Sequence, residues 1–138
     1  MNEIQLTTEE IDLLLTIGLI MEFDQKSPNN IPNGGVNEII VSNNIMEYEK
    51  FEEVEDSLYE YGLLDDEDFL TEKGKAYLEQ LEKDLKGLQK DKGAKCGNDY
   101  TKIVFEEVKN FIEKTNDKID WDMVCGICSI ASLILTVF

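Results

Sequence analysis

The sequence predicts a mainly α-helical fold, because most of the chain repeats apolar residues at helical spacing. Four long segments each carry an apolar stripe, and the breaks between them hold glycine, proline or asparagine. One break differs from the others: after Gly62 the chain passes through Leu63 and Leu64, a short acidic turn, and then Phe69 and Leu70. The chain therefore predicts helices joined by loops, with one compact turn between two of the helices.

The first helix is predicted to begin at Thr7, because Thr7 and Glu10 have the spacing of a capping box. Apolar residues cover more than half of its circumference as far as Phe23, so we expect it to pack against neighbours on two sides. Residues 24–35 hold two prolines and the pairs Asn-Asn and Gly-Gly, which predicts a loop. A short helix around Ile39 follows, with a strand as the alternative.

The second long helix is predicted over residues 46–61. Its inner face carries four apolar residues at helical spacing: Phe51, Val54, Leu58 and Tyr61. Its outer face carries Lys50 as the one base and is otherwise acidic, with Glu49, Glu52, Glu53, Asp56 and Glu60. Like charges four residues apart cost a helix roughly a few tenths of a kcal/mol per pair. Either selection favours acid on this face, or the cost is too small to be removed.

Two further helices are predicted after the turn. Thr71 is the expected N-cap of a helix over residues 72–90, whose seam is formed by Leu78, Leu81, Leu85 and Leu88. A linker rich in glycine and lysine follows, and Asp99 then caps a helix that ends near residue 115. The apolar stripe of that helix comprises Tyr100, Val104, Val108 and Phe111, helped by Ile103 and Ile112.

The last segment, from Asp120 to Phe138, carries no charge after Met123. An apolar helix of this kind must be buried, so we expect it in the core or in a dimer interface. A tail anchor is the alternative, but the uncharged run of sixteen residues falls short of the ~20 that span a bilayer, and no lysine cluster flanks it.

The order helix, Gly-Leu-Leu, turn, Leu-Thr-Glu-Lys-Gly, helix resembles the winged helix-turn-helix domains of the MarR and PadR type. The resemblance covers roughly residues 9–85 and is sharpest over 61–74. It implies a mainly α fold with a small β-hairpin wing, a helix over 46–61 that reads DNA, and terminal helices that form dimers. It predicts a winged-helix-like domain over 1–90 and a C-terminal helical pair over 98–138 that completes the core or dimerises.

The charge of the chain is unlike that of a DNA-binding domain. Thirty acidic residues face thirteen basic ones, all lysine, for a net charge of −17, and there is no arginine or histidine. Residues 1–72 hold nineteen acids and two lysines, so the whole excess lies on the segment that carries the resemblance. Arginine is the usual reader of guanine and clamp of phosphate, and a phosphate backbone repels carboxylates. The sequence therefore argues against direct DNA binding.

Catalytic and metal-binding motifs are weak or missing. Cys125 and Cys128 form a CxxC pair, which is a redox pair, half of a zinc site or buried core filler; Cys96 is the one further cysteine, and there is no histidine. The apolar surroundings of the pair favour core filler. Residues 65–68 lack the spacing of a calcium loop, which favours a solvated turn over a Mg²⁺ or Ca²⁺ site. We expect no enzyme activity, no cofactor and no metal, because the chain has no histidine to activate a serine or a cysteine.

Cysteine usage and the N-terminal residues predict a cytoplasmic protein. The cysteine count is odd, which argues against a secreted disulfide framework, and the first ten residues are acidic rather than positively charged.

The sequence favours a non-enzymatic binding module whose acidic face binds, and thereby inhibits, a basic nucleic-acid-binding protein by occupying its nucleic-acid site. The simpler alternative is that the acidic face is exposed to solvent and only keeps the protein soluble. Another is a dimeric winged-helix regulator that binds DNA through later lysines and dimerises from Asp120 to Phe138, and a third is a membrane-tethered adaptor. The predicted partner-binding residues are Glu49, Glu52, Glu53, Asp56, Glu60, Asp65, Asp66, Glu67 and Asp68.

Overall fold

The computed structural model describes residues 5–26, 35–42, 44–90, 99–115 and 117, and its regular secondary structure is helical. The mainly α-helical class is confirmed. The helices are α1 (Thr8–Lys26), α2 (Gly35–Ser42), α3 (Tyr48–Glu60), α4 (Glu72–Lys90) and α5 (Asp99–Lys114).

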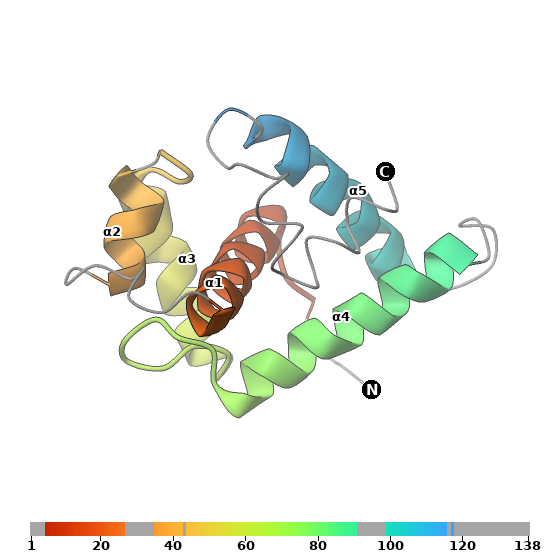
Figure 1. The fold of residues 1–138 in the computed structure, drawn as a ribbon, viewed down its shortest axis with the longest axis horizontal. Coiled ribbons are helices and arrows are strands. Elements are labelled where there is room, and N and C mark those ends of the chain that lie inside the picture. Colours follow the sequence, from red (N-terminus) through yellow and green to blue (C-terminus); the bar gives the residue numbers. More distant parts are fainter. Residues whose placement is uncertain (1–4, 27–34, 43, 91–98, 116, 118–138) are drawn as a thin grey trace.

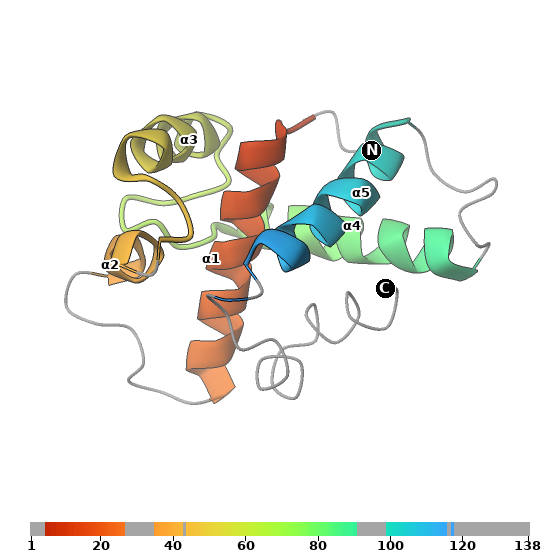
Figure 2. The same ribbon diagram turned by 90° about the horizontal axis from the view of Figure 1, so that it is seen from above.

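Helix α1 lies at the centre of the fold, with α2 and α3 on one side and α4 and α5 on the other (Figures 1 and 2). Residues on every side of α1 are buried, as the sequence predicted: Ile11, Leu13, Leu14, Leu15 and Ile17. The helix begins as a capping box, because the Thr7 N–H donates to Glu10 Oε1 at 2.8 Å and the Glu10 N–H donates to Thr7 Oγ1 at 3.3 Å.

Helix α3 ends in a Schellman motif. The Leu63 N–H donates to the Leu58 carbonyl at 3.0 Å, and the Gly62 N–H donates to the Tyr59 carbonyl at 2.9 Å. Gly62 has a φ of 79°, a conformation that costs other residues about 1–2 kcal/mol. This cap turns the chain sharply, so that Leu63 and Leu64 enter the core directly after the helix.

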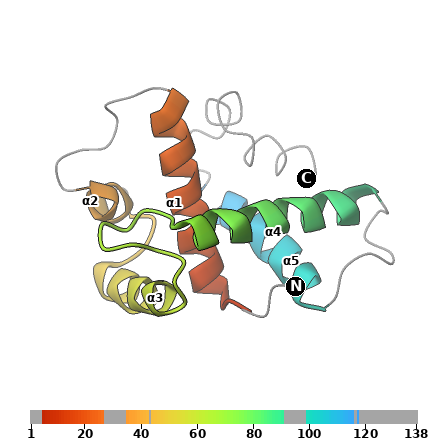
Figure 3. The same ribbon diagram turned by 90° about the horizontal axis from the view of Figure 1, so that it is seen from below.

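The turn between α3 and α4 is closed by backbone hydrogen bonds and lies against the start of α4 (Figure 3). Leu64 and Leu70 form a single antiparallel bridge, and the Thr71 N–H donates to the Leu63 carbonyl at 3.1 Å. The part of the chain that the structure describes contains no β-strand, so the predicted hairpin wing is reduced to this one bridge.

Helix α4 begins at a cap that also holds the turn. The Gly74 N–H donates to Thr71 Oγ1 at 3.0 Å, and that hydroxyl donates to the Gly62 carbonyl at 2.5 Å. The Leu70 N–H donates to the sulfur of Met21 on α1 at 3.2 Å. Thr71 is therefore the N-cap that the sequence predicted, and it links α4 to the end of α3.

Two predictions of burial are wrong. Tyr61, placed on the inner stripe of its helix, is 37% exposed, because α3 ends at Glu60 and the Schellman turn changes the direction of the chain there. Ile103 is 53% exposed, although Val104, Val108 and Phe111 of the same helix are buried as predicted.

Several predictions fall outside the described residues. They concern residues 27–34 of the predicted loop, the three cysteines and the apolar segment from Asp120 to Phe138. The loop was predicted over 24–35, and its ends are wrong, because α1 continues to Lys26 and α2 begins at Gly35. Among the helices that the structure describes, none combines the length and the apolar character needed to cross a bilayer.

Candidate partner-binding surface

The outer face of α3 is acidic along its whole length. Phe51, Val54 and Leu58 are buried and fix the rotation of the helix, so the opposite face is turned to solvent. All five acids that the sequence predicted on this face are exposed: Glu49, Glu52, Glu53, Asp56 and Glu60.

The turn continues this face, but its four acids have different roles. The carboxylate of Asp65 accepts the N–H groups of Glu67 at 2.8 Å and Phe69 at 3.0 Å, so this residue shapes the turn itself. Asp68 is half-buried and has a φ of 67°. Asp66 and Glu67 are exposed, and no backbone group of the turn binds their carboxylates among the described contacts. Asp66 and Glu67 are therefore the turn acids whose carboxylates do not shape the turn backbone.

Two side-chain contacts join α3 to the turn. The carboxyls of Glu55 and Asp68 lie within hydrogen-bonding reach of each other. Partial burial, the hydrogen bond to Asp68 and the charge of Asp68 together raise the pKa of Glu55 to about 8. A hydrogen bond to Asp66 raises the pKa of Tyr59. The face of α3 and the turn therefore form one continuous surface, called the acidic surface below: the nine predicted acids together with Glu55.

Glu55 was not among the residues predicted for this surface. Its position in the sequence gave no signal, because it follows Val54 on the border between the inner and outer faces of α3. Its contact with Asp68 depends on how the turn folds back on the helix, which spacing within the helix does not predict.

Aromatic side chains border the acids. Tyr48 and Tyr59 are each 51% exposed. The charge of Glu52, one turn after Tyr48, raises the pKa of that phenol. Tyrosine supplies contact area and a hydrogen-bonding group at once, a combination that is enriched at protein interfaces.

Few cations balance the acidic surface. Lys50 lies 3.7 Å from Glu53, and this is the one ion pair that the described residues of α3 make. Lys73 directs its ammonium group to the Tyr61 carbonyl at 2.8 Å, and Lys75 pairs with Glu72 on its own helix. The surface therefore carries a large excess of exposed negative charge.

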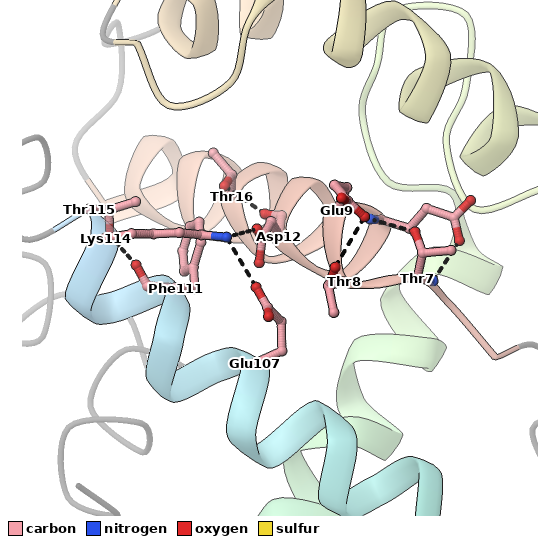
Figure 4. Close-up of polar contacts among 10 residues, drawn as sticks. Thr7, Thr8, Glu9, Asp12, Thr16, Glu107, Phe111, Lys114 and Thr115 are labelled. Atoms are coloured by element: carbon pink, nitrogen blue, oxygen red, sulfur yellow. Dashed lines mark hydrogen bonds and ion pairs between the residues drawn. The ribbon is translucent and has the colours of Figure 1, made fainter.

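A second polar cluster, between α1 and α5, was not predicted from the sequence; its two carboxylates are buried and its lysine, Lys114, is 52% exposed. Lys114 places its Nζ 2.5 Å from Asp12 Oδ2 and 3.2 Å from Glu107 Oε2 (Figure 4). The carboxylates are almost fully buried, with 6% and 8% of their side chains exposed. Glu107 also lines an open groove of about 340 Å³ between Thr8 and α5.

The two clusters differ in their charge and exposure. Among the described residues, no three metal-ligating side chains come together. The buried cluster holds a lysine between two carboxylates, and its pairing raises the pKa of Lys114 despite the opposing effect of burial, so the amine stays protonated. The acidic surface, by contrast, is exposed and carries an excess of negative charge.

Comparison of the chain with protein-family models, with curated proteins and with solved structures finds no match.

Proposed function

We propose that this chain is a winged-helix-like protein-binding module that uses the acidic surface to bind, and thereby inhibit, a basic nucleic-acid-binding protein. The carboxylates pair with lysine and arginine side chains of the partner that would otherwise contact phosphate. The observation that carries the proposal is the exposure of this acidic surface with Lys50 as its one paired cation among the described residues of α3.

The order of the elements supports the winged-helix part of the proposal. Three helices, a tight turn with one antiparallel bridge and a fourth helix follow one another as in the resembled domains. In that architecture α3 takes the place of the recognition helix and residues 64–70 take the place of the wing. These are the two elements that carry the acidic surface, so the face that reads DNA in the resembled domains is here negatively charged.

Charge decides what such a face can bind. A DNA backbone rewards positive charge through release of its counterions, and it repels carboxylates at close approach. A basic protein is attracted to the same carboxylates, and complementary charge speeds the encounter and excludes wrong partners. The exposed tyrosines, Tyr48 and Tyr59, add contact area that charge alone does not provide.

The crowding of the acids supports a binding role as well. Glu49 and Glu53, Glu52 and Asp56, and Asp56 and Glu60 are like-charge pairs one turn apart, each costing about 0.2–0.5 kcal/mol. A cationic side chain of a partner relieves this repulsion, so part of the binding free energy comes from strain already present in the free protein.

The test compares two triple charge reversals of the full-length chain. One variant carries Glu52→Lys, Glu53→Lys and Asp56→Lys on the acidic surface. The matched control reverses the same number of exposed acids on the opposite side of the fold: Glu79, Glu106 and Glu113. Each immobilised protein is incubated with host lysate at low and at moderate salt, and captured proteins are identified by mass spectrometry and then purified for affinity measurement.

We expect one basic partner that binds the natural chain and the control, is released by salt, and is lost from the acidic-surface variant. Equal capture by both variants would refute the proposal. Capture of duplex DNA in place of a protein, with tight sequence-specific binding, would support a transcriptional regulator instead.

A further inference from the structure

The buried cluster of Asp12, Glu107 and Lys114 is incomplete as a set of three ionised side chains. Two carboxylates and one ammonium group leave a net charge of −1 in a site where both acids are at least nine-tenths buried. In addition, Asp12 Oδ1 is buried and has no hydrogen-bond donor among the residues that the structure describes. A buried charge and an unsatisfied oxygen are both costly in a protein interior.

One proton removes the excess charge. The Glu107 carboxyl lies within hydrogen-bonding reach of Asp12, so a proton held by Asp12 can be donated in a hydrogen bond to Glu107. The cluster then carries one negative charge, which the ammonium group of Lys114 balances, so it is neutral as a whole.

We propose that Asp12 and Glu107 share a single proton in the folded protein and that this proton makes the attachment of α5 to α1 sensitive to pH. The cluster joins α1 to α5, and on α5 it lies near three buried apolar residues, Val104, Val108 and Phe111. Loss of the proton leaves an uncompensated charge in this interface and favours release of α5.

The surroundings of the pair agree with this assignment. Burial, and then the hydrogen bond with Glu107, raise the pKa of Asp12 to about 8, although Lys114 opposes the shift. The charged groups that act on Asp12 are Glu107 and Lys114, both from α5. Glu9, one turn earlier on α1, has a lowered pKa because of hydrogen bonds to its backbone and to Thr8, with smaller contributions from Lys50 of α3 and Lys114.

Protons can reach the pair from solvent. Glu107 lines the open groove of about 340 Å³ that also contacts Thr8, Lys102 and Asn110. The exchange of a proton through Glu107 therefore does not require the whole protein to unfold.

The sign of the pH effect follows from the direction of the shift. An unfolded chain gives up the Asp12 proton near the ordinary aspartate pKa, whereas the folded protein holds it up to about pH 8. Stability linked to Asp12 is therefore greatest at low pH, falls as pH rises toward 8, and is constant above it. Each pH unit in that window increases the unfolding equilibrium constant by about tenfold for the one proton released.

The test compares the natural chain with Asp12→Asn, whose amide is neutral at every pH and keeps the size of the carboxyl. Urea unfolding is measured from pH 5.5 to 8.5. Below pH 8, the unfolding equilibrium constant of the natural chain should increase by about tenfold more per pH unit than that of Asp12→Asn. Glu106→Gln, an exposed neighbour on α5, should retain the slope of the natural chain. Any contribution of Glu55 is the same in all three proteins and cancels in the comparison.

Two measurements on the natural chain keep the proposal testable even if Asp12→Asn fails to fold. The ¹³C carboxyl shift of Asp12 should titrate far above the ordinary range. Amide exchange, corrected for its intrinsic pH dependence, should show α5 losing protection as the pH rises toward 8, by more than α3 does. An Asp12 midpoint near pH 4, parallel stability slopes in the natural chain and Asp12→Asn, or α5 protection that does not change with pH would each overturn it.

Discussion

Replacing Gly74 with alanine should destabilise the protein, although alanine is the better helix former. A Cβ at this position would lie 2.2 Å from the Leu63 carbonyl oxygen and 3.2 Å from its carbon. That oxygen already accepts the Thr71 N–H at 3.1 Å, so it cannot move away without loss of a hydrogen bond. The clash therefore pushes the turn away from α4 at the point where the two elements meet.

The magnitude follows from three opposing effects. Overpacking costs about 3 kcal/mol when the obstacle is backbone, at the upper end of its usual range. Loss of the hydrogen bond between Thr71 and Leu63 adds about 1 kcal/mol. The better helix propensity of alanine returns about 1 kcal/mol. The expected net loss is about 3 kcal/mol, a large fraction of the stability of a small domain.

Urea unfolding followed by far-UV circular dichroism measures this loss as a lower midpoint at an unchanged slope. Lys75→Ala changes the exposed neighbour and should alter the free energy of unfolding by only about 0.3 kcal/mol. Gly18→Ala is a second comparison: its Cβ would meet the end of the flexible Leu78 side chain at 2.7 Å, which can shift, so its cost should be smaller. A Gly74→Ala protein as stable as the natural chain would refute the close contact between the turn and α4.

Three further changes test the cap and the acidic surface. Thr71→Ala removes the acceptor for the first turn of α4 and should cost about 1–2 kcal/mol in urea unfolding, with Thr71→Ser restoring most of it. Asp56→Lys turns two repulsive pairs, with Glu52 and Glu60, into attractive ones; it should stabilise the free protein by about 1 kcal/mol and weaken partner binding. Glu55→Gln removes a carboxyl whose pKa is raised to about 8, so its stability relative to the natural chain should increase from pH 5 to pH 8 and then stay constant.

Each of these changes has an outcome that contradicts it. Equal stability of the alanine and serine variants at position 71 would show that the hydroxyl does not stabilise the start of α4. A destabilised Asp56→Lys protein would show that repulsion on α3 is negligible. For Glu55, Glu49→Gln is the control on the same helix, and a pH-independent difference between Glu55→Gln and the natural chain would contradict the contact with Asp68.

Local signals in the sequence predicted the helices well. The predicted range of 72–90 matches α4, and Thr7 and Thr71 cap the helices that they were expected to cap. Capping and apolar periodicity depend on residues three or four apart, which the chain displays directly. Periodicity fails where a helix ends or a face lacks a neighbour, and for that reason Tyr61 and Ile103 were wrongly placed in the core.

Local patterns in the sequence did not predict the cluster of Asp12, Glu107 and Lys114. Asp12 stands in a strongly apolar run, which signals that a carboxyl there needs a partner. Its partner Lys114 is 102 residues away, and nothing in the local pattern of α5 selects that lysine from its neighbours. Pairs that depend on how helices cross require the folded structure.

Because the chain has no histidine, the two carboxyls with raised pKa values can be detected by titration. Histidine is the side chain whose ordinary pKa lies within the range from about pH 5 to 8, and this chain has none. Asp12 and Glu55, with pKa values of about 8, instead hold protons through neutrality. A potentiometric titration of the folded protein, compared with the same chain in urea, therefore counts these protons with no histidine buffering to subtract.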